Sequence, residues 1–144
     1  MKTWHKVLLI TLVFAVPAFA LGPMIWPPDP HVGTPAGMQL AFFILLAAIT
    51  AITFGLGIAF LLYGLPLVQR VTDGSASRTW ATFFATGWML LSWWPHDNMH
   101  KHNGMELGGL LVIEYLFHVT MMVAGLIVAY NLVRSLQSAP KTNV

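Results

Sequence analysis

Four long apolar segments, separated by short polar or proline-rich connections, dominate the hydrophobic pattern of the chain. They cover residues 7–20, 38–63, 79–95 and 107–133. The second segment carries no charged residue over 26 positions. That length exceeds the roughly 20 apolar residues that a helix needs to cross a bilayer. The pattern therefore predicts an all-α integral membrane protein, a helical bundle with four transmembrane helices.

The first apolar segment is compatible with two interpretations. Val7 to Ala20 follows two lysines and ends in the small-x-small pattern Ala18-Phe19-Ala20, which is typical of a cleaved signal peptide covering residues 1–21. Alternatively, the apolar stretch continues to Trp26 and forms a first transmembrane helix with an interfacial tryptophan. Three transmembrane helices remain if the segment is cleaved, and in both cases residues 22–144 form a single helical membrane domain.

The third and fourth segments differ in how they end and in what they contain. Residues 79–95 finish in Trp93-Trp94-Pro95. Because proline disfavours the helical conformation of the residue before it, we expect this helix to end at Trp94 and residues 96–106 to form a loop. Residues 107–133 carry one acid, Glu114, and one histidine, His118, inside an otherwise apolar helix.

Composition supports the membrane class and excludes several others. Of the 144 residues, 57% are hydrophobic and only 8% are charged, whereas about a quarter of a soluble domain is charged. A net charge of +2 gives too little basic surface for nucleic-acid binding. There is no cysteine, which excludes disulfides and thiolate metal sites. The expected partners are the lipid bilayer and either a larger membrane-protein complex or further copies of the chain.

Positive charges predict the orientation in the cell membrane. Six of the seven basic residues fall in three alternate non-membrane segments: Lys2, Lys6, Arg70, Arg78, Arg134 and Lys141. Since cytoplasmic segments are enriched in lysine and arginine, we expect both termini on the cytoplasmic side and the loop 96–106 on the extracytoplasmic side. Cleavage of the first segment would leave the new N-terminus extracytoplasmic.

Three histidines lie close together after the third segment. His96 and His100 are four residues apart, so a helical turn beginning at Pro95 would place both imidazoles on one face, with His102 pointing elsewhere. In an extended loop, His100 and His102 would instead share a side. Either geometry provides two imidazole nitrogens, which is fewer than a complete metal site requires.

Glu114 and His118 could complete such a site from the last helix. They are also four residues apart and therefore share a face. With a membrane edge near Leu107, a rise of about 1.5 Å per residue puts Glu114 roughly 10 Å and His118 roughly 16 Å deep. A carboxylate at that depth is costly unless it is paired, so we expect Glu114 to face the bundle interior.

These residues together predict a metal ion bound by His96, His100, His102, Glu114 and His118. Histidine with carboxylate suits iron or zinc, and histidine with thioether suits copper. Four methionines could supply thioethers: Met99, Met105, Met121 and Met122. Copper or iron is the prediction, and zinc is an alternative. A haem fits poorly, because only His118 is deep and the second and third segments contain no histidine.

The predicted role is metal handling, or service as an accessory to a membrane oxidoreductase. Two other functions remain open. The polar residues of a non-catalytic structural or assembly subunit would only hold helices together, and a proton-coupled carrier would use Glu114. Enzymatic activity is not predicted, since the chain shows no nucleophile with its base and no phosphate-binding glycine loop.

Overall fold

The computed structural model describes residues 2–31, 33–104 and 108–138, and these residues form helices joined by loops and turns, with no strand among them. The elements are α1 (Thr3–Ile25), α2 (Gly37–Tyr63), α3 (Leu65–Val71), α4 (Ala76–Asn103), the 3₁₀ turn η1 (Gly108–Leu110) and α5 (Leu111–Ser138). The all-α prediction is confirmed. The helix predicted over residues 38–63 differs from α2 by a single residue.

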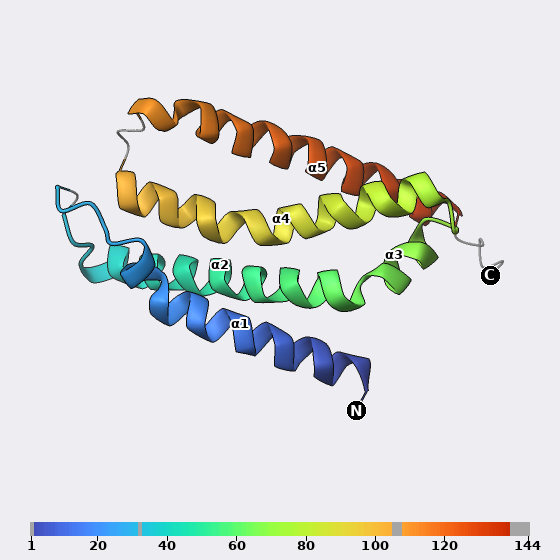
Figure 1. Cartoon of the computed structure of the whole chain (residues 1–144), viewed down its shortest axis with the longest axis horizontal. Helices are drawn as coiled ribbons and strands as arrows, with labels where there is room; N and C mark the ends of the chain where they lie inside the picture. Colours follow the sequence, from blue (N-terminus) through green and yellow to red (C-terminus); the bar gives the residue numbers. More distant parts are fainter. Residues whose placement is uncertain (1, 32, 105–107, 139–144) are drawn as a thin grey trace.

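The four long helices lie side by side in the order α1, α2, α4, α5, and α3 forms a short bend between α2 and α4 (Figure 1). Successive long helices run in opposite directions. The start of α1, the whole of α3 and the end of α5 therefore lie at one end of the molecule, and the histidine-bearing end of α4 lies at the other. The segments with most of the basic residues thus gather at one end, as the predicted topology requires.

Among the residues that the structure describes, three helical segments are long and apolar enough to cross a membrane: Thr3–Ile25, Gly37–Tyr63 and Gly108–Gln137. The first includes the whole apolar stretch 7–20, so the interpretation of this stretch as part of a membrane helix agrees with the fold. α4 is not among the three, and the expectation that residues 79–95 span the membrane stays a prediction. α4 nevertheless lies between α2 and α5 (Figure 1).

Small residues allow the helices to approach closely. A Cβ atom on Gly55 of α2 would meet the backbone of α1 at the Thr11 carbonyl and, at 2.9 Å, at the Ala15 nitrogen. A Cβ on Gly57 would meet the Leu91 side chain of α4 at 2.8 Å. Helices in a bilayer associate through this kind of close packing, because the hydrophobic effect does not drive them together there.

The prediction that the third helix ends at Trp94 is wrong, since α4 continues through Pro95 to Asn103. Proline removes one backbone hydrogen bond, but neighbouring helices hold the side chains around it. The Trp94 indole nitrogen donates to the Ala18 carbonyl of α1 at 3.2 Å, and His96 contacts Glu114 of α5. Packing on both sides therefore outweighs the local preference of proline. The segment expected as a loop is helical as far as Asn103, and residues 105–107 lie outside the described part.

Candidate metal centre

The antiparallel packing of α4 and α5 brings the predicted ligands to matching levels. His100 lies three residues before the end of α4, and Glu114 lies three residues after the start of α5. His96 and His118 are each one helical turn further from that end of the pair. With about 1.5 Å of rise per residue, His100 lies level with Glu114, and His96 lies level with His118. The site is therefore a consequence of the register between the two helices.

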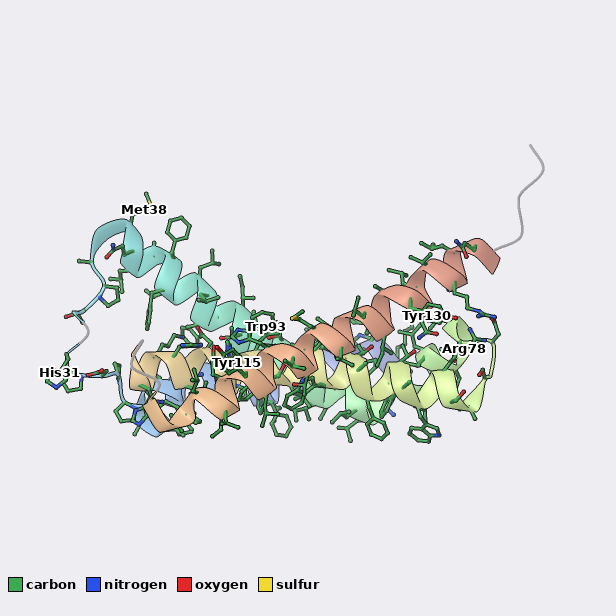
Figure 2. All side chains as sticks on the ribbon, turned by 90° about the horizontal axis from the view of Figure 1, so that it is seen from above. His31, Met38, Arg78, Trp93, Tyr115 and Tyr130 are labelled. Atoms are coloured by element: carbon green, nitrogen blue, oxygen red, sulfur yellow. The ribbon has the colours of Figure 1, made fainter. Side chains whose placement is uncertain are left out.

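Glu114 is the centre of the cluster. One carboxylate oxygen, Oε1, lies 3.1 Å from His100 Nε2 and 3.2 Å from His118 Nδ1. The other, Oε2, lies 3.3 Å from His96 Nε2. Glu114 and His96 are buried, His100 is partly buried, and the His118 side chain is about half exposed. Figure 2 labels Trp93 and Tyr115, which mark the parts of α4 and α5 where these residues lie.

Two atoms of the cluster are buried without a hydrogen bond. His96 Nε2 and Glu114 Oε2 face each other at ion-pair distance, but neither has a partner with hydrogen-bonding geometry. Buried polar atoms are nearly always hydrogen-bonded, because an unpaired one costs on the order of 1–3 kcal/mol. Both atoms therefore remain available to a ligand placed between the helices.

His96, His100 and Glu114 could hold a metal ion. Each offers one ligand atom, and the three atoms lie within 4.8 Å of one another. Two histidines and one carboxylate form the donor set of non-haem iron sites and of some zinc sites, which leave coordination positions open. The structure thus brings the Glu114 carboxylate of the last helix to His96 and His100, and the binding of a metal ion by these residues stays a prediction.

Aromatic rings surround the inner imidazole. The Phe117 ring of α5 lies 5.3 Å from the His96 ring, and the Trp93 ring meets it edge-on at 6.3 Å. The His118 ring lies 5.0 Å from the His96 ring. Such a shell limits the access of water and orients the ligand ring, two properties that tune metal sites.

The structure does not bring His102 to this group. Its Nδ1 lies 2.6 Å from the Pro27 carbonyl oxygen, and its ring meets Trp26 edge-on at 6.1 Å. This is the outcome expected if the histidines lie on a helix, where His102 points away from His96 and His100. His118 contacts Glu114 without joining the three mutually close ligand atoms.

Four methionines and Asp97 lie near the candidate ligands in the sequence. Met99 and Met121 are buried, Met122 is exposed, and Met105 lies outside the described residues. Asp97 does not hydrogen-bond to a histidine of the cluster. Its Oδ2 instead accepts from the Lys101 ammonium and, at 3.4 Å, from the Thr50 hydroxyl of α2. This ion pair was not predicted, although the four-residue spacing of Asp97 and Lys101 could have indicated it.

The sequence matches no protein-family model, and comparisons with curated proteins and with solved structures give no significant match. The function is therefore argued from the geometry of the chain itself.

Proposed function

We propose that this membrane protein binds a transition-metal ion through His96, His100 and Glu114. The observation that carries the proposal is the convergence of two imidazole nitrogens and a carboxylate from two helices, with His96 Nε2 and Glu114 Oε2 buried and unpaired. A structural hydrogen-bond network would be expected to pair both atoms. A metal ion would instead accept both lone pairs and offset the charge of the buried carboxylate.

The donor set favours iron over copper. All three ligand atoms are nitrogen or oxygen, whereas copper sites commonly add a sulfur ligand. Zinc shares the same donors and is the competing ion. His118 supports the site from α5, because its contact with Glu114 Oε1 holds the carboxylate in place.

The proposed role is metal handling at the extracytoplasmic face or service as an accessory to a membrane oxidoreductase. Three protein ligands leave room for a further ligand from a partner protein or a small molecule. The partly exposed His100 lies on the side nearer the end of α4, so an ion would approach the buried pair past this imidazole.

Elemental analysis of the detergent-purified protein tests the proposal. We expect about one iron or copper ion per chain in the wild type and a loss of most of it in His96→Ala/His100→Ala. His102→Ala is the matched control and should retain the metal, because its imidazole contacts Pro27 instead. Absence of stoichiometric metal from the wild type after reconstitution with ferrous, cuprous and zinc ions would overturn the proposal and favour a structural subunit. Equal metal content in all three proteins would also overturn it.

A further inference from the structure

A second candidate site lies on the opposite side of α4. A cavity of about 320 Å³ opens between α1, α2 and α4, with walls that include Trp26, Phe43, Thr50, Trp94, Asn98 and Lys101. It lies near the N-terminal part of α2, which diverges from the other helices around Met38 (Figure 2). Its α4 residues follow the helical spacing i, i+4, i+7, and they leave His96 and His100 on the other face.

Two side chains of the cavity have hydrogen-bond donors that the protein does not fully use, Trp26 and Lys101. The Trp26 indole nitrogen is buried and has no acceptor. The Lys101 ammonium, which has three N–H donors, is bound by Asp97 and lies 4.8 Å from the centre of the Phe43 ring. Asn98 donates its amide to the Trp94 carbonyl at 2.7 Å. A ligand that supplies acceptor oxygens would pair the Trp26 donor and the remaining Lys101 donors.

Charge and shape narrow the class of ligand. Asp97 already neutralises Lys101, so a fatty acid or phosphate group would bring a second anion next to a partly buried carboxylate. A neutral carbonyl avoids that repulsion. Aromatic walls from Trp26, Phe43 and Trp94 suit a flat ring. The volume is near the lower limit of about 300 Å³ for ligand pockets, which fits a single ring better than a two-chain lipid.

We propose that this cavity binds the head group of a lipid-soluble quinone. The ring lies between the aromatic side chains, and its carbonyl oxygens accept from Trp26 Nε1 and Lys101 Nζ. The quinone enters from the bilayer, because α1 and α2 are both apolar enough to span it. The proposal concerns binding alone and does not depend on metal at the centre between α4 and α5.

Saturation binding of radiolabelled decylubiquinone to the full chain in lipid nanodiscs tests this inference, with binding to empty nanodiscs subtracted. We expect one saturable site per chain in the wild type. Trp26→Phe keeps an aromatic ring but removes the N–H donor, so affinity should fall about fivefold, as for the loss of one hydrogen bond. Trp88→Phe is the matched control, because the Trp88 indole donates to Thr120 on the side facing α5.

A second pair of variants keeps the test independent of hydrogen bonding. Ala47→Leu fills the cavity and should abolish saturable binding. Ala41→Leu adds the same bulk at an exposed position of α2 and should leave binding unchanged. His96→Ala/His100→Ala should also bind the quinone normally, which separates this inference from the metal proposal. No saturable binding by the wild type, or undiminished binding by Ala47→Leu, would overturn it. Equal competition by decylbenzene, which lacks carbonyls, would also overturn it and show that the cavity accepts only an apolar chain.

Discussion

Replacing Glu114 by glutamine distinguishes a metal ligand from a residue that only joins helices. The amide has almost the same shape and still offers an oxygen acceptor to His100 and His118, so the helix contacts survive. It loses the negative charge that a cation requires. Loss of a residue that only hydrogen-bonds to a metal ligand weakens metal affinity by about 10–100-fold. We therefore expect the loss of a direct carboxylate ligand to weaken it by at least about 100-fold.

That loss converts into a measurable difference in thermal stability. At a metal concentration of about 100 times the wild-type Kd, bound metal stabilises the folded wild type by about 2.7 kcal/mol, whereas a 100-fold weaker site gains about 0.4 kcal/mol. For a chain of this length, 1 kcal/mol shifts Tm by about 2–4 °C. We therefore expect metal to raise the Tm of the wild type by roughly 5–11 °C and that of Glu114→Gln by roughly 1–2 °C.

The measurement is the thermal loss of helical circular dichroism in detergent, with and without added iron. His102→Ala serves as control and should show the full rise in Tm, because it leaves the three ligands intact. Equal rises in the wild type and Glu114→Gln would refute the assignment of Glu114 as a ligand. No rise in the wild type with iron, and none with copper or zinc added in its place, would refute the metal site itself.

The remaining predictions concern pH, packing, processing and topology. Metal retention on dialysis should fall as the pH is lowered, because protonated imidazole cannot ligate. Elemental analysis would show this, and retention that does not change with pH would argue against imidazole ligands. Gly55→Ala should lower the metal-free Tm, since the added methyl overlaps the α1 backbone at a cost of about 1–3 kcal/mol. The methyl group added by Gly33→Ala meets nothing within 4 Å, so this variant should leave Tm unchanged. Equal changes in Tm for the two variants would contradict the close α1–α2 contact. Intact-mass spectrometry should find a mass that includes α1. A mass equal to that of a chain starting near Leu21 would show cleavage instead. Because the chain has no cysteine, an impermeant maleimide added to whole cells should label Gly33→Cys but not Ser77→Cys, and the reverse pattern would invert the proposed topology.

The apolar runs predict the helices well, because the length of α2 and the isolation of Glu114 in α5 follow from the cost of placing polar groups in a membrane. The histidine spacing left two alternatives open, and the structure shows the helical one, in which His96 and His100 share a face. The end of α4 could not be predicted locally, since contacts from α1 and α5 carry the helix past Pro95.

The contact between His100 and Glu114 was a hypothesis that the sequence pattern could suggest but not establish. It depends on the register between α4 and α5, which spacing along one helix cannot reveal. The cavity beside Trp26 and Lys101 also requires three helices to be placed relative to one another. Sequence periodicity thus predicts which side chains share a face, but not which faces meet.

The row-like order of the helices gives an ion between α4 and α5 a mechanical role as well. α5 is the last helix of the row, and its main neighbour is α4 (Figure 1). Two ligands come from α4 and one from α5, so a bound ion would cross-link the terminal helix to the rest of the molecule. In a chain without cysteine, this coordination would link the two helices reversibly. The link would form when metal binds and would open when a chelator or acid removes the metal.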